Sequence, residues 1–545
     1  MAFDSQDHPA LGESYGVLVL AGHIKKIFGS KVDVDIFDSQ VHSAAYLVDR
    51  IEKYQPHLLG FSIKINSYDN FEIAYRKIHR SLNPDNQPLL VFGNSIPTFA
   101  PEEMLKRFPE GIVCIGEGEE VLEGLVKHLQ GKVGLEDIAN LAYLRNGEMY
   151  KTKGKLIQSS YLTSLPNRSF SEYIANKGGQ IYLESSRGCH WGRCTFCAIR
   201  DMNESVSNRR IWRKIPIDKV IDNLRDLANR KINNKEFVFV DEEFFGFGSE
   251  GLDRTQTLAK EIKNANLDVQ FAISTRVDAI YKEDDSSEQR SRRLEAIEQL
   301  IESGLKTVFL GVESGSDSQR KRYGKGNSIH EAEKAMEILS NYGVRLDIGF
   351  ITFDPLMSID ELEENLNFIE RNGLVGKVSA IPNELRPQKG TKYIEILKVA
   401  SIKENVAYAG ELNINTLFYE ILRYRSKDVE KIKTEVSKTW NKSYRFYYAL
   451  KGRIRAETNG SIRHQLLTMM ESLQKNDINL IKELIRYSRE ACLEKNFSQA
   501  ISKYETIRCN LFDAFKKTVR KLNASHAKYS FIKEIKLLEE FENGS

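Results

Sequence analysis

Three cysteines, Cys189, Cys194 and Cys197, stand within nine residues directly after the apolar run 181–183. Three thiolates so close together can ligate three irons of a 4Fe–4S cluster and leave the fourth iron open to another ligand. An open metal position is typical of catalytic sites, whereas structural metal sites are closed. The spacing therefore predicts a catalytic iron–sulfur centre.

A zinc site is the competing interpretation, because His190 could complete a set of three cysteines and one histidine. His190 directly follows Cys189, however, and two adjacent residues reach one metal only with strain. The other cysteines, Cys114, Cys492 and Cys509, stand alone in the sequence. The iron–sulfur interpretation is favoured.

The segment 185–197, Ser-Ser-Arg-Gly-Cys-His-Trp-Gly-Arg-Cys-Thr-Phe-Cys, resembles the radical S-adenosylmethionine (radical SAM) enzymes. Its C-x4-C-x2-C spacing is one residue longer than the commonest form and is similar to a branch that usually carries a cobalamin-binding domain. The resemblance implies a cluster held by Cys189, Cys194 and Cys197, with S-adenosylmethionine (SAM) bound to the open iron. It also implies that Phe196 lies against the adenine.

Length and composition indicate several domains of a globular protein. The chain has 545 residues, and its 79 basic and 76 acidic residues give a net charge of +3. This balance argues against nucleic acid as the principal partner. We find no apolar stretch of about 18 residues and expect no membrane association. Six cysteines, three of them clustered, fit a reducing cytoplasm, so we expect a cytoplasmic protein.

Residues 1–135 alternate between apolar strand-like runs, such as 32–37 and 58–63, and amphipathic helices. This pattern predicts an α/β fold with a Rossmann-like, doubly wound parallel sheet, whose ligands bind at the carboxyl ends of the strands. Small residues in the turns at those ends let a ligand approach the backbone. The residues of these turns are Gly60, Ser62, Gly93, Asn94, Gly116, Glu117 and Gly118.

This layout resembles the cobalamin-binding domain that precedes many radical SAM domains, and the resemblance implies that those seven residues contact cobalamin. Gly93-Asn94 stands where that family often has Gly-Gly. Two features depart from the family: residues 1–15 do not read as its first strand, and its Asp-x-His-x-x-Gly signature is absent. The alternative is a fold retained as a docking domain without cofactor.

Residues 136–178 read as a linker with a small hairpin around Gly147. From 179 to 400 the strand–helix alternation returns six times, which predicts a partial (β/α)6 barrel of the TIM type with its site at the strand ends. The expected strands are 180–185, 236–241, 269–275, 307–312, 346–352 and 377–385.

Polar residues follow three of these strands. Three adjacent carboxylates, Asp241, Glu242 and Glu243, need a cation or amine to neutralise them, unless they form a solvated turn. By resemblance, Glu242 or Glu243 binds the SAM amine. Ser274 and Arg276 would reach the SAM carboxylate or ribose, since arginine pairs with a carboxylate in two places. By the same resemblance, Glu313 and Ser314 would face the ribose; capping of the next helix is the plain alternative.

Residues 401–545 predict an α-helical domain that caps the barrel and contributes to substrate specificity. Apolar residues recur at helical spacing in 417–422 and in 478–487. The basic run 423–427 is interleaved with acidic residues farther along the tail, as on a solvated helix face.

The resemblance implies an enzyme that cleaves SAM reductively and modifies an unactivated carbon of a small-molecule or peptide substrate. Its electron would come from an external flavodoxin- or ferredoxin-like reductant. With cobalamin, the expected outcome is C-methylation; without it, epimerisation, rearrangement, cyclisation or crosslinking. Methylthio transfer is not expected, because no second three-cysteine set is present. A non-enzymatic metal scaffold and an RNA-modifying enzyme are the alternatives from other classes.

Overall fold

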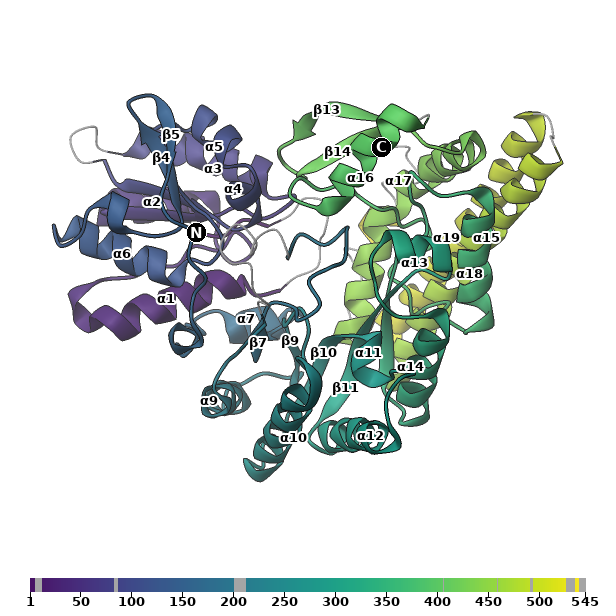
Figure 1. Ribbon diagram of the computed structural model, residues 1–545, viewed down its shortest axis with the longest axis horizontal. Coiled ribbons are helices and arrows are strands. Elements are labelled where there is room, and N and C mark those ends of the chain that lie inside the picture. Colours follow the sequence, from purple (N-terminus) through teal and green to yellow (C-terminus); the bar gives the residue numbers. More distant parts are fainter. Residues whose placement is uncertain are drawn as a thin grey trace.

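The computed structural model describes residues 1–4, 12–82, 87–199, 212–404, 406–457, 459–490, 494–525 and 535–538. Two sheet-containing parts lie side by side, and long helices flank the second of them (Figure 1). The architecture is α/β with a helical C-terminal part.

The N-terminal sheet has the order β1-β2-β3-β4-β5. Its first three strands, β1 (Leu58–Ser62), β2 (Leu89–Gly93) and β3 (Ile112–Cys114), are parallel. The hairpin predicted around Gly147 forms as β4 (Leu141–Arg145) and β5 (Glu148–Lys151) and adds two antiparallel strands to this sheet. The helices of this part are α1 (Tyr15–Phe28), α2 (Ala44–Tyr54), α3 (Tyr68–Ser81), α4 (Ser95–Phe99), α5 (Pro101–Arg107) and α6 (Glu119–Leu129).

Residues 1–3 lie beside β1, where a further parallel strand would stand, and are joined to it by an isolated bridge. Ala2 bridges Ser62 of β1 on one side and Asp38 on the other, both in parallel. The Ser62 amide donates to the Met1 carbonyl at 2.8 Å, and the Ala2 amide donates to Phe37 at 2.9 Å. The strand expected over 32–37 is wrong, because its neighbour in the sheet is too short to extend a ladder and only the bridge at Asp38 forms.

The second sheet is parallel throughout, with the order β12-β11-β10-β9-β6. The strands are β6 (Tyr182–Leu183), β9 (Glu236–Phe239), β10 (Gln270–Arg276), β11 (Leu305–Glu313) and β12 (Arg345–Phe350). The sixth expected strand, 377–385, is wrong: only isolated bridges form, Ile348 with Val378 and Phe353 with Glu384. Pro382 lies between them and has no amide hydrogen to continue a ladder.

Helices cover the outer face of this sheet and enclose its core. Capping boxes at Ser286, Ser328 and Ser358 start three of them. The alternation along β10 places Phe271 and Ile273 in the core beneath the helices and Ser274 on the opposite, inner face. The helices are α9 (Ile217–Ala228), α10 (Gly248–Asn264), α12 (Ser287–Glu302), α14 (Ile329–Asn341) and α15 (Ile359–Arg371).

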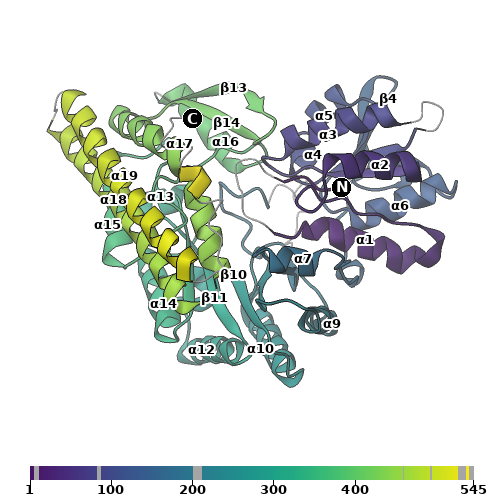
Figure 2. The same cartoon turned by 180° about the vertical axis from the view of Figure 1, so that it is seen from behind.

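The C-terminal part begins with helix α16 (Lys392–Lys403) and an antiparallel hairpin, β13 (Ala407–Asn413) and β14 (Phe418–Arg423). The helix expected from the apolar spacing in 417–422 is therefore wrong, since that segment is β14. Three long helices follow, α17 (Lys427–Ala456), α18 (Gly460–Arg489) and α19 (Glu494–Ser525), packed side by side (Figure 2).

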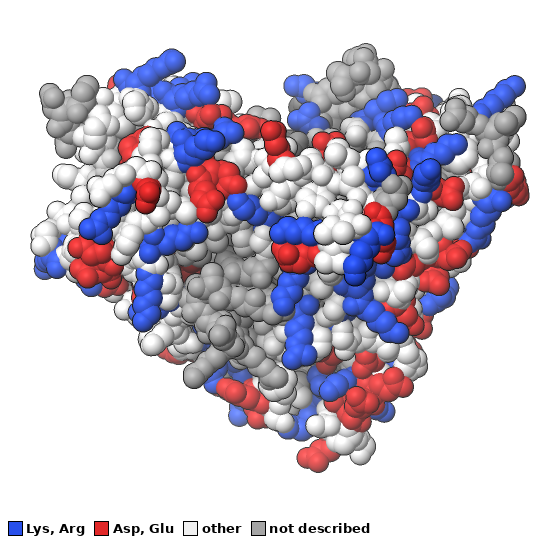
Figure 3. Space-filling view, turned by 45° about the horizontal axis from the view of Figure 1, so that its top comes forward, with Lys and Arg blue, Asp and Glu red and all other residues white. Residues whose placement is uncertain are grey.

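The surface carries both signs of charge. Lysine and arginine alternate with aspartate and glutamate across the face shown in Figure 3, without a broad region of one sign. Among the described helices, none has the length and apolar character that crossing a bilayer requires.

Candidate functional site

The three-cysteine loop is held by the segment 322–326 and by the start of α16. The Thr195 amide donates to the Tyr323 carbonyl at 2.9 Å, and the Thr195 carbonyl accepts from Tyr393 at 2.8 Å. The indole of Trp191 donates to the Gly324 carbonyl at 2.8 Å. Two main-chain bonds and one side-chain bond thus fix the loop against segment 322–326 and the start of α16.

The three cysteines interact electrostatically with one another. Burial, with smaller contributions from Cys194 and Cys189, raises the pKa of Cys197 to about 12, and burial also raises the pKa of Cys189. The Arg276 guanidinium lies 3.8 Å from the sulfur of Cys194. The three thiols are partly buried, and the Arg276 cation beside them favours the thiolate form, in which cysteine binds a metal.

Within the described residues, no three or more His, Cys, Asp or Glu side chains are already gathered around one metal-binding point. The Nδ1 of His190 lies 3.1 Å from the carboxylate of Glu243, which lies outside the three-cysteine loop. The donor types fit an iron–sulfur cluster better than zinc.

The three adjacent carboxylates have three different surroundings. Asp241 is buried and accepts from the amides of Ser185 and Ser186; burial raises its pKa to about 7. Glu243 is fully buried, and both of its oxygens accept hydrogen bonds. Its donors are the amides of Phe245 and Gly246, the hydroxyl of Thr275 and the ring of His190.

Glu242 is exposed, and one of its oxygens accepts from the Gly188 amide at 2.8 Å, next to Cys189. Of the two glutamates that the sequence could not separate, Glu242 alone keeps an oxygen without a hydrogen bond among the described contacts. Glu243 instead supports its own turn.

Arg276 ends β10 and is buried. It forms an ion pair with Asp278 at 2.8 Å and donates to the Lys325 carbonyl at 2.8 Å. Its guanidinium also lies 4.7 Å from the ring centre of Trp191. Arg276 thus ties the end of β10 to the cysteine loop, while Ser274, two residues earlier, is partly exposed on the inner face.

Glu313 and Ser314 end β11 but point differently. Glu313 has a φ of 70°, a left-handed conformation that is unfavourable for glutamate, and its carboxylate lies 3.4 Å from the Lys325 ammonium. Ser314 is fully buried and donates to Gln319 at 2.6 Å. Ser314 therefore supports the turn, whereas Glu313 remains on the inner face.

Phe196 packs edge-on against Tyr323 and lines a cavity of about 330 Å³. This cavity adjoins the end of β12 and the segment that replaces the sixth strand. Its remaining lining residues are Ile351, Asn383, Glu384, Leu385, Arg386, Gln388, Phe418 and Tyr448.

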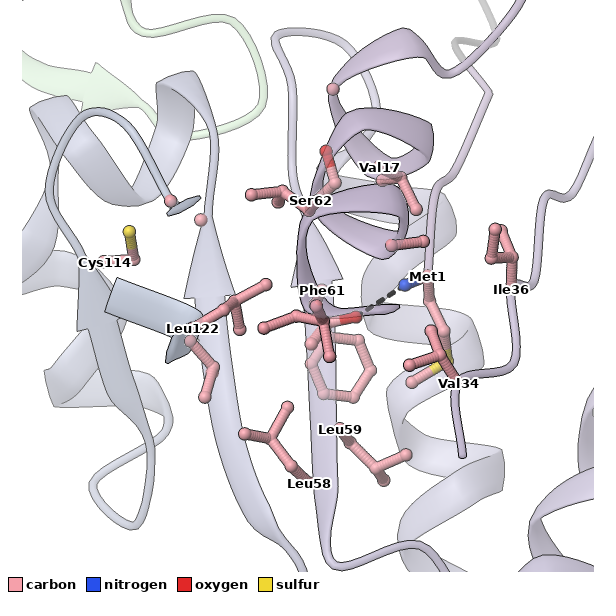
Figure 4. Close-up of a pocket in the computed structure, with 18 of the residues that line it drawn as sticks. Met1, Val17, Val34, Ile36, Leu58, Leu59, Phe61, Ser62, Cys114 and Leu122 are labelled. Carbon is pink, nitrogen blue, oxygen red and sulfur yellow. Dashed lines mark hydrogen bonds between the residues drawn. The ribbon is translucent and has the colours of Figure 1, made fainter. Parts of the chain in front are cut away.

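A second, larger cavity of about 1080 Å³ lies over the N-terminal sheet, between α1, α6 and the strands (Figure 4). Its wall is mainly apolar, with Val17, Leu58 and Leu122 among the side chains drawn in Figure 4. All seven turn residues expected around cobalamin line it: Gly60, Ser62, Gly93, Asn94, Gly116, Glu117 and Gly118.

The turn at Gly93-Asn94 shows why small or amide residues stand there. Asn94 has a φ of 81°, which asparagine tolerates better than most residues, and its side-chain amide donates to Ser62 at 3.0 Å. A wide apolar cavity floored by turns of this kind fits a large flat cofactor such as cobalamin.

Ion pairs join the turns around the large cavity to the segment that precedes the cysteine loop. Arg213 contacts both oxygens of Glu117, at 2.7 and 2.8 Å. Arg187, two residues before Cys189, lies 3.3 Å from Glu117, 2.7 Å from Glu119 and 2.7 Å from Glu184. Although burial acts in the opposite direction, Arg187 holds the pKa of Glu119 below its ordinary value.

Sequence reasoning missed Arg187, Arg213 and Lys325. Arg187 lies in the motif itself and could have been noted for its position, but two of its three partners, Glu117 and Glu119, come from the N-terminal part of the chain. No local signal marks Arg213 or Lys325, because both acquire their roles only through contacts made by the folded chain.

Family models match two parts of the chain. Residues 183–369 match the model of the radical SAM superfamily, and residues 9–126 match the model of the B12 binding domain. The first match contains the cysteine loop and the strand ends, and the second contains most of the turns around the large cavity.

Curated relatives and solved structures agree with this division. The 4′-phospho-dehydrooxetanocin synthase of Priestia megaterium is 30% identical over 381 residues, which are 68% of this chain and 50% of that protein. The chain thus spans half the length of that relative. An uncharacterized methyltransferase of Pyrococcus horikoshii is 25% identical over 66% of this chain and 73% of its own length.

The structure of OxsB, a cobalamin-dependent SAM radical enzyme with aqua-cobalamin and SAM bound, matches with a TM-score of 0.81 at 21% identity. The match covers 98% of this chain and 81% of OxsB. The radical SAM methyltransferase TsrM of Kitasatospora setae matches with a TM-score of 0.60 at 13% identity. That match covers 89% of this chain and 97% of TsrM. These likenesses show the fold. Together with the family models, they support a 4Fe–4S cluster, SAM and cobalamin as the cofactors.

Proposed function

We propose that this chain cleaves SAM reductively and modifies an unactivated carbon of its substrate. The premise is that the chain belongs to the radical SAM superfamily and carries a B12 binding domain. Cobalamin-dependent C-methylation of a small molecule or peptide is the reaction that the combination supports best. When bound, the cluster and cobalamin supply one-electron cleavage of SAM and methyl-group transport. The remaining steps belong to the chain's own residues.

The residues of the barrel edge would hold the first two cofactors. Cys189, Cys194 and Cys197 would ligate the cluster. Glu242 would accept from the SAM amine with the oxygen that the Gly188 amide leaves available. Phe196 would pack on the adenine, since it lines the 330 Å³ cavity beside the loop.

Ser274 and Glu313 would contact SAM from the inner face of the sheet. Arg276 would act by fixing the cysteine loop and adding positive charge beside Cys194, because its donors are largely used by Asp278 and Lys325. Glu243 and Ser314, both fully buried, would position the turns without touching SAM.

One observation supports a reaction that uses both SAM and cobalamin. The wall of the large cavity includes Glu184, Arg187 and Glu242, which belong to the barrel edge, besides the turns of the N-terminal sheet. A cofactor in that cavity would therefore face the SAM site. Transfer of a group between two cofactors and a substrate requires this kind of proximity.

The test is anaerobic reconstitution with iron and sulfide, followed by incubation with SAM, hydroxocobalamin and dithionite. We expect release of 5′-deoxyadenosine, and an absorbance spectrum of the desalted protein that retains cobalamin. S-adenosylhomocysteine formed with a substrate would support methylation, and 5′-deoxyadenosine without it would favour a different radical outcome. Zinc in place of iron, or no SAM cleavage, would refute the proposal.

A one-electron donor of the flavodoxin or ferredoxin type would replace dithionite in the cell. We also propose a reducing cytoplasmic location, because an oxygen-sensitive cluster persists there and a clustered set of thiols stays reduced. Support of SAM cleavage by purified flavodoxin with its reductase would test the donor.

A further inference from the structure

Helix α17 lies along the open side of the five-stranded barrel. Near its end, Lys451 donates to the hydroxyl of Ser379 at 2.7 Å, in the segment that replaces the sixth strand. One turn later, Arg455 pairs with Asp347 of β12 at 2.5 Å. A Cβ placed on Gly178, just before β6, would lie 3.3 Å from Ala456. The last turns of α17 therefore span the gap from β12 to β6.

The inner face of the sheet is open at this level. Phe309 is on the same face of β11 as Glu313, because the two are four residues apart, and it is 37% exposed. Asp347 is its direct neighbour in the parallel register. At about 3.3 Å per residue, Asp347 lies roughly 13 Å along the strands from the level of Glu313. A substrate between them would be within reach of the SAM site.

The charges at this level do not cancel. The groups acting on Lys451 are Arg455 on its own helix and Asp347 on β12. Arg345, on the same strand, pairs with Glu236. Lys451 and Arg455 thus share one carboxylate. Burial, with the added repulsion of Arg455, lowers the pKa of Lys451 to about 8, which an approaching anion would reverse.

We infer that α17 forms one wall of the substrate chamber, and that Lys451 and Arg455 bind an anionic group of a small-molecule substrate, either a phosphate or a carboxylate. The inference rests on the proposed function for the identity of the chamber. Arginine pairs with such groups through its planar fork, and lysine adds a compact charge.

Binding of inorganic phosphate and of acetate to the reconstituted full-length protein tests this at constant ionic strength. We expect saturable binding by calorimetry, with at least tenfold weaker affinity in Lys451→Met and near wild-type affinity in Lys451→Arg. The control is Lys442→Met, on the same helix, where the lysine pairs with Glu505 at the surface. Stronger binding of phosphate than of acetate assigns a phosphate, and the reverse assigns a carboxylate.

Equal affinity in wild type and folded Lys451→Met would overturn the inference. Should Lys451→Met fail to fold, pH decides: wild-type binding must weaken above about pH 8 as Lys451 loses its proton, whereas Lys451→Arg must not weaken. A pH-independent wild type overturns the inference as well. Because SAM cleavage without substrate does not enter these measurements, failure here is distinguishable from failure of the proposed function.

Discussion

The parallel strands of the two sheets present the same edge to ligands but line it differently. The N-terminal sheet ends in glycine, serine and asparagine below an apolar cavity of about 1080 Å³. The barrel strands lead into Glu242, Arg276 and Glu313, of which Glu242 also lines that cavity. The first edge offers volume and close backbone approach, and the second offers charges at fixed positions. A parallel sheet therefore sets where a ligand lies, while side-chain size and charge determine which ligand it is.

The largest effect is expected from removing one cluster ligand at the charged edge. Cys194→Ala should abolish SAM cleavage and lower the bound iron, because two thiolates cannot replace three. Cys509→Ala, on α19, should retain wild-type cleavage. Quantifying 5′-deoxyadenosine and iron checks both, and cleavage by Cys194→Ala would remove the cluster assignment.

Placing a side chain in the large cavity over the N-terminal sheet should have the next largest effect. A Cβ on Gly93 meets its nearest neighbour, Cys114, at 3.8 Å, so the backbone tolerates a side chain that enters the cavity. Gly93→Leu should weaken cobalamin binding at least tenfold while SAM cleavage continues. Gly410→Leu, at an exposed position of β13, is the control.

Cobalamin absorbance after desalting measures the loss. Unchanged retention in Gly93→Leu would show that the cofactor does not use this cavity.

The ion pairs that join the two edges should matter less than either ligand set. Glu117→Gln removes the charge that Arg213 and Arg187 share, which costs about 1–3 kcal/mol in folding free energy. We expect roughly tenfold slower product formation with cobalamin still bound. The large cavity remains, but it is held less firmly against the cysteine loop.

Glu120→Gln, three residues later in the first turn of α6, is the matched control. Its partner, Lys155, is at the surface, where an ion pair contributes less than about 1 kcal/mol. Equal effects of the two substitutions on rate and on melting temperature would show that Glu117 has no special part in joining the edges.

The smallest expected effect is a pH dependence confined to the barrel edge. The native pKa of Asp241, raised by burial to about 7, exceeds its value in the unfolded chain. The native state then binds more protons between about pH 4 and 7, so stability falls as pH rises through that window. Asp241→Asn should flatten that slope by about 1 kcal/mol per pH unit in denaturant titrations. An unchanged slope would contradict the protonated native form.

Local patterns predicted most of what positions the site. Strand–helix alternation located β1 to β3 and β9 to β12. The small residues at Gly93 and Gly116 marked the strand ends that line the large cavity. The prediction of secondary structure failed in two places. The apolar spacing in 417–422 fits either a helix or a strand, and the segment is a strand; in 377–385, Pro382 interrupts the apolar run and no strand forms. Residues 1–3 were missed because three residues carry too little periodicity to identify a strand.

Contacts between distant segments could not be predicted. Glu117 and Glu119, which pair with Arg187, belong to the N-terminal part of the chain. Glu243 differs from Glu242 because it accepts from the Gly246 amide and the Thr275 hydroxyl, which only the folded chain brings together. The sequence limited the candidates for binding the SAM amine to Glu242 and Glu243, and their hydrogen bonds in the structure distinguish the two.

The closing wall of the barrel comes from α17, about 100 residues beyond the last strand along the chain, and not from a further strand. The strand ends that hold the cofactors and the helix that completes the enclosure are therefore encoded separately. Substitutions along one side of α17 can alter the shape and polarity of that enclosure and leave the cysteine loop untouched. New substrate preferences can accordingly arise in the tail of such a chain at little risk to its reactive centre.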